Sequence, residues 1–298
     1  MKKQGTKIIV ILGPTASGKS KLAIKIAKKF NGEIISADSR QVYKGLDIGT
    51  EKITKKEMNG IRHYLIDVAK PKKIYTVVQY QRAAKKILKQ IFQKGKIPII
   101  CGGSGLYIDA LIYDYKLPAV APQKSLRGRL EKKSTEELFK MLQGLDPERA
   151  VDIDPRNPRR LIRALEIVLK TGRPVPKIEK QSPYQTLKIG LKKSVSQLRR
   201  SIRQRLKKTL KKGLVEETKK LHREGLSWKR LNALGLEYRL AADYLRGLIS
   251  CEEMTEQMER KIRRYAKRQM TWFKRDKDII WISNPQKAFA ICRDWLGL

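Results

Sequence analysis

Residues 7–20, "KIIVILGPTASGKS", decide the fold. After Lys7, the first residues are apolar and mostly β-branched, which is typical of a buried parallel strand. The following residues fit the phosphate-loop (P-loop) template, in which two glycines bracket four residues and are followed by Lys and Ser. Apolar residues then recur at helical spacing as far as Phe30, so the template lies between a strand and a helix. The predicted loop consists of Gly13, Pro14, Thr15, Ala16, Ser17, Gly18, Lys19 and Ser20.

A P-loop binds phosphate groups through its backbone. Its amides form an anion-binding concavity at the start of a helix, where the helix dipole also favours negative charge. Lys19 is expected to reach phosphate oxygens, and the Ser20 hydroxyl is expected to ligate Mg²⁺. The alternative is a glycine turn that binds nothing. The pattern leaves open whether the bound phosphates belong to a nucleotide or to a diphosphate that leaves during a reaction.

The rest of the chain predicts an α/β fold with a P-loop NTPase-like parallel sheet and a mainly helical insertion. "EIISAD" (33–38) and "IPIICGG" (97–103) read as buried strands, with a helix over 76–93 between them. We assign 1–115 and 186–298 to the core, which has basic C-terminal helices. The proline-rich stretch 116–185 is the insertion. Further strands are expected at 186–191 and 278–283, around a basic helical stretch.

The charge of the chain favours a nucleic-acid partner. Lys and Arg total 68 against 29 acidic residues, a formal net charge of +39. Such an excess attracts polyanions and repels other copies of the chain, so we expect a monomer. A solubilising lysine surface is the alternative, but the clustering of Arg favours nucleic acid. No apolar stretch approaches the roughly 18–20 residues of a membrane span, and we expect a cytoplasmic protein with no membrane partner. The three cysteines are far apart, which disfavours disulfides and zinc.

Two polar residues follow predicted strands at the edge where parallel sheets bind ligands. Asp38 could help to hold Mg²⁺, accept a proton from a nucleophile, or cap the next segment. Ser104 follows the strand that in P-loop kinases often ends in an Asp, and this argues weakly against simple phosphoryl transfer. The glycines of "CGGSGLY" (101–107) either let a substrate approach the backbone or form a tight turn. The general base is expected to be an Asp or Glu side chain unless His63 supplies it.

Arginine-rich segments lie in the second half of the chain. "NPRRLIRALE" (157–166) places Arg159 and Arg163 on one helix face, and "LRRSIRQRLKK" (198–208) contains Arg205. In "RKIRRYAKRQMTWFKRDKD" (260–278), basic residues alternate with the aromatic Tyr265, Trp272 and Phe273. Guanidinium groups bind phosphate and stack on bases, as aromatic rings also do. Taken as a group, these arginines favour an RNA partner. For any single Lys in these segments, an exposed surface position without a function is the better interpretation.

Six segments in order resemble the tRNA dimethylallyltransferase (tRNA isopentenyltransferase) family. They are "GPTASGKS", "ADSRQVYKGLDIGTEK", "RHYLID", "GGSGLY", "NPRRLIRALE" and "AKRQMTWFK", and they span about residues 8–274. The resemblance implies transfer of a dimethylallyl group from dimethylallyl diphosphate to the exocyclic N6 amine of the adenosine just 3′ of the anticodon, with release of diphosphate. It implies a tRNA anticodon stem-loop as partner and Mg²⁺ as cofactor.

The resemblance also implies roles for individual residues. Residues 13–20 would hold the diphosphate of the prenyl donor, with Ser20 on the metal. Asp38 would be the general base, and Ser104 and Arg205 would also be catalytic, with Arg205 helping to bind diphosphate. The positions that match tRNA contacts are Asp38, Ser39, Arg40, Gln41, Ser104, Arg127, Arg159, Arg160 and Arg163.

Three positions depart from the family pattern. Ser104 stands where Thr is usual, so a hydroxyl is retained. Ser201 replaces a common arginine one turn before Arg205, which leaves Arg200 or Arg203 to substitute for it. The segment that usually reads Gly-Tyr-Arg or Gly-Tyr-Lys is "GLEYR" (235–239), with Glu237 in place of the glycine.

Three other functions are compatible with parts of the sequence. A metabolite kinase would explain the P-loop but neither the basic helices nor the glycine-rich strand end. An RNA-binding protein whose loop senses nucleotide would modify no tRNA. A prenyltransferase of free adenine nucleotides shares the chemistry, but one nucleotide does not need so wide a basic surface.

Overall fold

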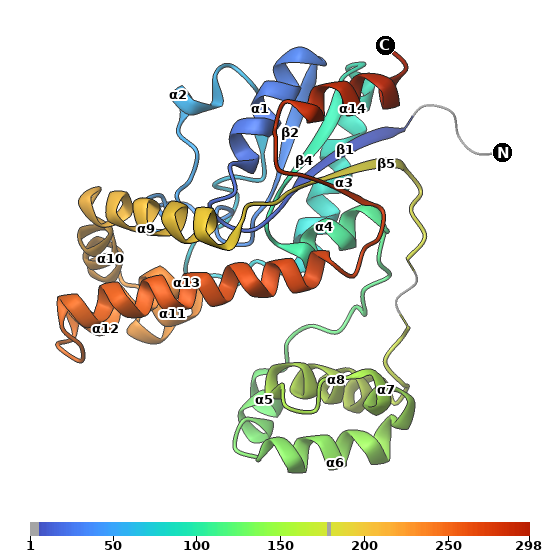
Figure 1. Cartoon of the computed structure of the whole chain (residues 1–298). Coiled ribbons are helices and arrows are strands. Elements are labelled where there is room, and N and C mark those ends of the chain that lie inside the picture. The colour runs from blue at the N-terminus through green and yellow to red at the C-terminus, as the bar shows by residue number, and fades with distance from the viewer. Residues whose placement is uncertain (1–5, 178–179) are drawn as a thin grey trace. The chain divides into compact units, whose positions relative to one another are not determined.

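A parallel sheet forms the centre of the larger part of the molecule (Figure 1). The computed structural model describes residues 6–177 and 180–298. Its six strands lie in the order β3-β2-β4-β1-β5-β6, and every neighbouring pair is parallel. The strands are β1 (Lys7–Leu12), β2 (Gly32–Ala37), β3 (His63–Tyr64), β4 (Ile97–Gly102), β5 (Gln185–Leu191) and β6 (Ile279–Ile282). The predicted fold class and the predicted return of the chain to the sheet are therefore confirmed.

Helices cover both faces of the sheet. On one face, Ile9 and Ile11 of β1 pack in a cluster with residues of α1 (Lys19–Lys29) and α14 (Lys287–Leu296). On the other face, Ile8 and Val10 join a larger cluster with α3 (Val77–Gln93), α4 (Gly105–Ile112) and the C-terminal helices. A strand with apolar side chains on both faces reads as a continuous hydrophobic run, which explains the sequence of residues 8–12. The short α2 (Lys55–Met58) lies in the connection between β2 and β3.

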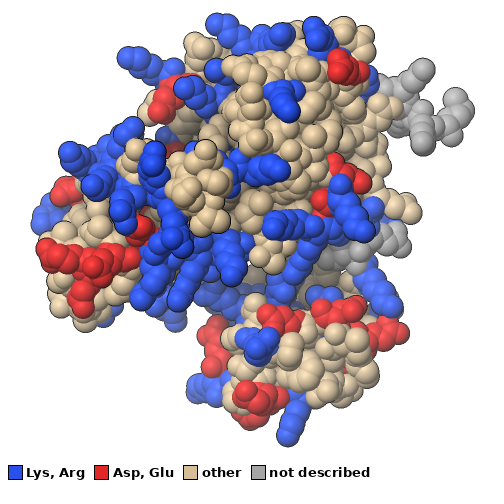
Figure 2. Space-filling view, in the orientation of Figure 1, with Lys and Arg blue, Asp and Glu red and all other residues tan. Residues whose placement is uncertain are grey.

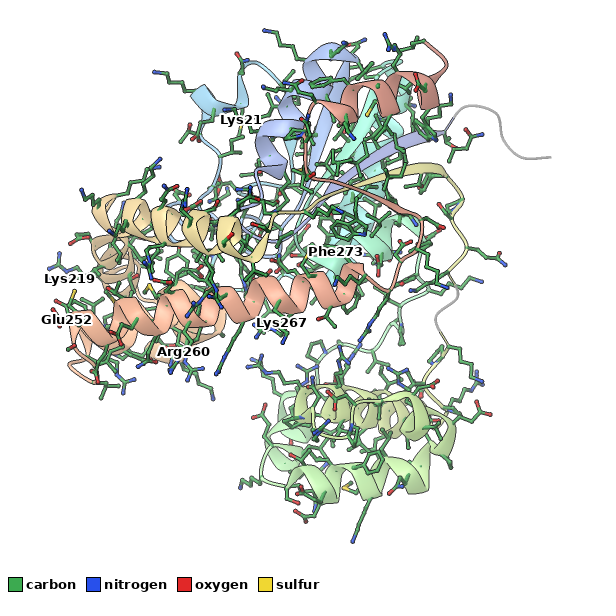
Figure 3. All side chains as sticks on the ribbon, viewed as in Figure 1. Lys21, Lys219, Glu252, Arg260, Lys267 and Phe273 are labelled. Atoms are coloured by element: carbon green, nitrogen blue, oxygen red, sulfur yellow. The ribbon has the colours of Figure 1, made fainter. Side chains whose placement is uncertain are left out.

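The basic C-terminal stretch forms a group of helices between β5 and β6. They are α9 (Val195–Lys211), α10 (Leu214–Arg223), α11 (Trp228–Leu234), α12 (Leu236–Leu245) and α13 (Cys251–Phe273). The long α13 buries one stripe, at Met254, Met258, Ile262, Ala266 and Phe273, and leaves its basic positions outside that stripe. Figure 2 shows Lys and Arg gathered over α9 and α13, and Figure 3 labels Arg260 and Lys267 along α13.

Residues 115–180 form a second compact unit. It contains α5 (Lys124–Leu130), α6 (Thr135–Leu145), α7 (Pro147–Asp152) and α8 (Pro158–Thr171). Its own core includes Leu138, Leu142, Leu161 and Leu165. Proline at the first position of α7 and α8 fits these helix starts, because that position needs no backbone N–H donor.

Within the described residues, no helix has the length and apolar character needed to cross a membrane.

Candidate active site

The P-loop connects β1 to α1. Gly18 precedes the first turn of the helix with a positive φ of 94°, a conformation that favours glycine. Gly13 passes close to β5, and a Cβ atom at Gly13 would lie 2.8 Å from the carbonyl oxygen of Leu191. Both glycines thus stand where another residue would fit poorly, and Gly18 leads directly into the N-terminus of α1, the part of a helix that favours phosphate.

Lys19 is the cation inside this loop. Its ammonium donates a hydrogen bond to the carbonyl oxygen of Pro14, at 3.3 Å. Burial lowers the pKa of Lys19, and the positive charge of Arg205 acts in the same direction. An ammonium in such a position is stabilised by an anion, and a phosphate group would supply one.

Arg205 reaches the P-loop from α9. Its Nη1 donates to Thr15 Oγ1 at 2.6 Å, and its Nε lies 2.6 Å from Glu51 Oε2. Glu51 also accepts a hydrogen bond from Thr209, one turn further along the helix. A carboxylate thus fixes the guanidinium against the loop. Among the described residues, the other N–H groups of Arg205 make no further hydrogen bond, so they can bind a ligand.

Gln269 of α13 joins the P-loop to the end of β4. Its Oε1 accepts from the backbone N–H of Thr15 at 2.8 Å, and its Nε2 donates to the carbonyl oxygen of Gly103 at 2.9 Å. The side chain is buried. Both ends of the amide are therefore used, and the basic helix is attached directly to the loop that binds phosphate.

Other groups of the protein fill the space beside the glycines at and after the end of β4. A Cβ atom at Gly102 would lie 2.1 Å from the carbonyl oxygen of Ala37, and one at Gly103 would lie 2.2 Å from Gln269 Nε2. At Gly105 it would lie 2.3 Å from Trp272. At each of these three positions a side chain would meet other protein groups, which fits the tight-turn alternative. Gly102 also lines the first cavity, so approach of a substrate to its backbone stays a prediction.

Asp38 directly follows β2, at the edge of the sheet that also carries the P-loop. Its Oδ1 accepts hydrogen bonds from the backbone N–H groups of Arg40 and Gln41, at 2.8 and 3.3 Å. Asp38 therefore caps the turn that follows β2, as one of the sequence-based alternatives predicted. Within the described part of the chain, Oδ2 makes no hydrogen bond, so one carboxylate oxygen is left for a ligand. Asp38 lines two of the cavities.

The other predicted site residues of the core surround this turn. Ser104 Oγ accepts from the backbone N–H of Ser39 at 3.0 Å, which leaves the hydroxyl proton free to be donated. The Gln41 side chain donates to the carbonyl oxygens of Thr50 and Glu51. Arg40 is exposed, and its guanidinium donates to the carbonyl oxygen of Ala233. The turn is thus rigidly held between β2, β4 and the loop at 50–51.

Three cavities meet at the P-loop. The first, of about 130 Å³, contains Lys19, Ser20 and Asp38. The second, of about 430 Å³, has a basic wall. That wall includes Arg40, Lys261, Arg264 and Arg268. These two cavities share Thr15, Asp38, Thr50, Arg205 and Tyr265. The third, of about 680 Å³, lies against α9 and shares Lys19, Ser20, Glu51 and Arg205 with the first.

His63 and Cys101 also line the first cavity. Burial lowers the pKa of His63, whose Nδ1 is 2.8 Å from the carbonyl oxygen of Ile61. Burial raises the pKa of the Cys101 thiol to about 11. The thiol is therefore protonated at neutral pH and is a poor nucleophile.

Glu217 of α10 holds the loop that carries Glu51. Its carboxylate accepts from the backbone N–H groups of residues 47, 48 and 49 at 2.8–3.0 Å. It also accepts from the Tyr238 hydroxyl at 2.7 Å. Tyr238 is buried and belongs to this support, and it also lines the second cavity. Glu237, its neighbour, lines the second cavity, and burial raises the pKa of its carboxyl.

The aromatic residues of α13 do not form a common stacking surface. Phe273 is buried in the core, and Trp272 Nε1 donates to Asp109 of α4 at 3.0 Å. Tyr265 lines the first and second cavities, and Trp272 and Phe273 line neither of these two. Stacking of Tyr265 on a base stays a prediction.

The remaining predicted arginines lie in the second unit. Arg127 donates to both oxygens of Glu166, through Nε at 2.8 Å and Nη2 at 2.7 Å. Arg163 donates to the same carboxylate at 2.6 Å. Arg159 and Arg160 are exposed. Glu166 is fully buried, and these bonds lower its pKa to about 2 despite the opposing effect of burial.

Sequence reasoning missed three residues of the site. Gln269 continues the apolar stripe of α13, and a polar side chain in such a stripe is a signal that could have been used. Glu51 binds Arg205, and Glu217 binds the backbone of residues 47–49. Both contacts join segments far apart in the chain, and no local sequence pattern predicts them.

Comparisons with known proteins agree on one family. A family model described as IPP transferase matches residues 41–276. A tRNA dimethylallyltransferase of Thermoanaerobacter sp. (strain X514) is 45% identical over 286 residues, covering 92% of this chain and 91% of that protein. The corresponding protein of Geobacillus thermodenitrificans is 42% identical over 296 residues, covering 96% and 93%.

Solved structures agree with the sequence matches. The tRNA isopentenylpyrophosphate transferase of Bacillus halodurans has a TM-score of 0.74 and 36% identity, covering 98% of this chain and 96% of that one. A eukaryotic dimethylallyltransferase acting on tRNA has a TM-score of 0.84 and 27% identity, covering 98% and 80%.

Proposed function

The chain belongs to the IPP transferase family, and from this premise we propose how its site performs the reaction. The protein transfers a dimethylallyl group from dimethylallyl diphosphate to the N6 amine of the adenosine just 3′ of the anticodon in tRNA, releasing diphosphate. The observation that carries the proposal is the meeting of the P-loop, Arg205 and Asp38 at adjoining cavities.

The P-loop holds the leaving group. An adenine amine is a weak nucleophile, so the allylic carbon must lose its diphosphate while the new bond forms, and negative charge accumulates on the departing oxygens. Lys19, Arg205 and the loop amides all supply positive charge or N–H donors there. Preorganised donors of this kind contribute most to many enzymatic rate enhancements. The fixed position of Arg205 between Thr15 and Glu51 supports this role.

Asp38 is the general base for the amine. Its Oδ1 is fixed by two backbone N–H groups, and Oδ2 accepts the proton as the carbon–nitrogen bond forms. Ser104, which holds the turn through Ser39, donates its hydroxyl proton to the base of the tRNA. The adenosine must leave its stack to enter such a site. We assign its entry to the second cavity, where Tyr265 offers an aromatic ring for stacking.

The donor set of the first cavity suits Mg²⁺. The Ser20 hydroxyl and the carboxylates of Asp38 and Glu51 line it, and these are the hard oxygen donors that this ion prefers. Among the described residues, no group of three or more His, Cys, Asp or Glu could form a metal cage. Mg²⁺ binds typically through few protein ligands together with substrate phosphates. We assign Ser20 as its protein ligand, and the ion would neutralise charge on the diphosphate.

Binding of tRNA involves both units. In the core, residues 38–41 and Ser104 contact the anticodon loop. In the second unit, Arg127, Arg159, Arg160 and Arg163 contact its backbone, since guanidinium groups bind phosphate well. The positively charged surface over α9 and α13 (Figure 2) supports an RNA partner. A monomeric state and a cytoplasmic location stay predictions.

The test is mass spectrometry of tRNA nucleosides after incubation with the protein, Mg²⁺ and dimethylallyl diphosphate. We expect one adenosine per substrate tRNA to gain the mass of a dimethylallyl group. Labelled ATP with candidate metabolites serves as the parallel reaction. Transfer of label from ATP, or prenylation of free AMP in preference to tRNA, would contradict the proposal.

A further inference from the structure

Lys193 is a cation at the P-loop that has no role in the proposed reaction. It lies in the turn between β5 and α9, next to Ser194, the N-terminal cap of α9. Its Nζ donates to the carbonyl oxygen of Ala16 in the P-loop at 2.9 Å and to Ser201 Oγ at 2.8 Å. The side chain is half-buried.

The ammonium of Lys193 has no negatively charged partner in the described part of the chain. Both acceptors are neutral, and burial lowers the pKa of Lys193. Taking a charge out of water without a counter-charge is costly. An ammonium also has three N–H donors, and these two bonds leave one of them for a further acceptor.

Lys193 lines the third cavity together with P-loop residues. The wall includes Lys19, Ser20, Ser201 and Arg205. Two other cations of that wall are neutralised: Arg205 pairs with Glu51, and Lys52 pairs with Asp47 and Asp67. Lys21, Lys208 and Lys212 also line the cavity and have no ion pair within the described residues. Lys193 and Lys19 differ from these three, because their ammonium groups donate to carbonyl oxygens of the P-loop itself.

We propose that Lys193 is a second diphosphate-binding lysine, which contacts phosphate oxygens from the α9 side of the P-loop. Its ligand class is the diphosphate of a prenyl ester, and the inference rests on the proposed role of the P-loop. Ser201 and Ala16 position the ammonium, and the remaining N–H donates to the ligand. Helix α9 carries no cation of its own at position 201, so Lys193 supplies positive charge there from the preceding turn.

The test measures binding of inorganic diphosphate to the full-length protein by calorimetry in the presence of Mg²⁺. In Lys193→Met we expect binding to weaken by about 10-fold or more, the loss typical of a hydrogen bond to a charged group. Lys193→Arg keeps the positive charge and N–H donors, so it should weaken binding less than Lys193→Met does. Lys192→Met is the matched control, because Lys192 is an exposed neighbour, and it should leave binding unchanged.

Two further measurements separate ligand binding from mere support of the loop. Affinity for tRNA should be unchanged in Lys193→Met, and its melting temperature shows whether it folds. Ser201→Ala removes one acceptor but keeps the ammonium, so it should weaken diphosphate binding less than Lys193→Met does. An equal loss in both variants, or diphosphate binding by Lys193→Met equal to that of the unaltered protein, would overturn the inference alone. Absence of diphosphate binding by the unaltered protein would overturn the proposed role of the P-loop as well.

Discussion

Replacing Glu166 by Gln should destabilise the second unit and misplace two of its arginines. The carboxylate is fully buried and receives hydrogen bonds from Arg127, Arg163 and the backbone N–H of Gln123. A glutamine has nearly the same shape, but its NH₂ group would face guanidinium donors. The substitution therefore removes the charge that both arginines need.

The magnitude follows from the acidity of Glu166. Its pKa falls from the ordinary value of 4.5 to about 2 in the folded protein. At about 1.4 kcal/mol for each pKa unit, this corresponds to roughly 3.5 kcal/mol of stability, in line with the ~3–5 kcal/mol lost when a buried ion pair loses one partner. Because the folded pKa is the lower one, this contribution is fully present above pH 4.5. It is lost as the pH falls towards 2.

Hydrogen exchange of the amides of α8, followed by mass spectrometry, measures this effect within the second unit. At pH 7 we expect the exchange of the slowest α8 amides in Glu166→Gln to be about 100-fold faster. Binding of tRNA should weaken as well. Glu148→Gln, which breaks an exposed ion pair with Lys177, is the control and should change neither quantity. Unchanged exchange in Glu166→Gln would refute the reasoning.

Three further substitutions test the support of the site. Gln269→Met leaves the Thr15 N–H and the Gly103 carbonyl without partners; we expect a loss of about 2–4 kcal/mol in urea unfolding and weaker diphosphate binding, whereas an unchanged diphosphate affinity would contradict the link to the P-loop. Glu217→Ala releases residues 47–49; the KM for dimethylallyl diphosphate should rise and exchange at 47–51 should quicken, with the exposed Glu216→Ala as control. Gly105→Ala forces a methyl group against Trp272; we expect about 1–3 kcal/mol of destabilisation in urea, and a neutral effect would show that α13 can shift freely.

Much of the fold was predictable because local patterns decide it. The apolar run at 8–12, the P-loop template and the helical spacing after Ser20 each agree with the element that forms. The strands at 97–102 and 185–191 were found within a residue or two for the same reason. Consistency between local preference and tertiary environment makes such predictions work.

The site was predictable only where a motif carries it. Residues 13–20 and Asp38 stand beside strands, so topology brings them to one edge of the sheet. The partners of Arg205 and Gln269 come from segments far away in the chain, and neither pairing has a local pattern. For the glycines of "CGGSGLY", spacing likewise shows that a side chain is missing but not what fills the space.

The most direct test compares transfer and binding in Asp38→Asn. Asparagine retains an Oδ1 acceptor for the backbone N–H groups of Arg40 and Gln41, so the turn should keep its shape. It cannot accept the proton of the amine. Single-turnover transfer to tRNA should fall by about 100-fold or more, while the affinities for tRNA and for diphosphate stay within about 3-fold. Transfer at the unaltered rate, or an equal loss of transfer and tRNA affinity, would contradict the assignment of Asp38 as the base.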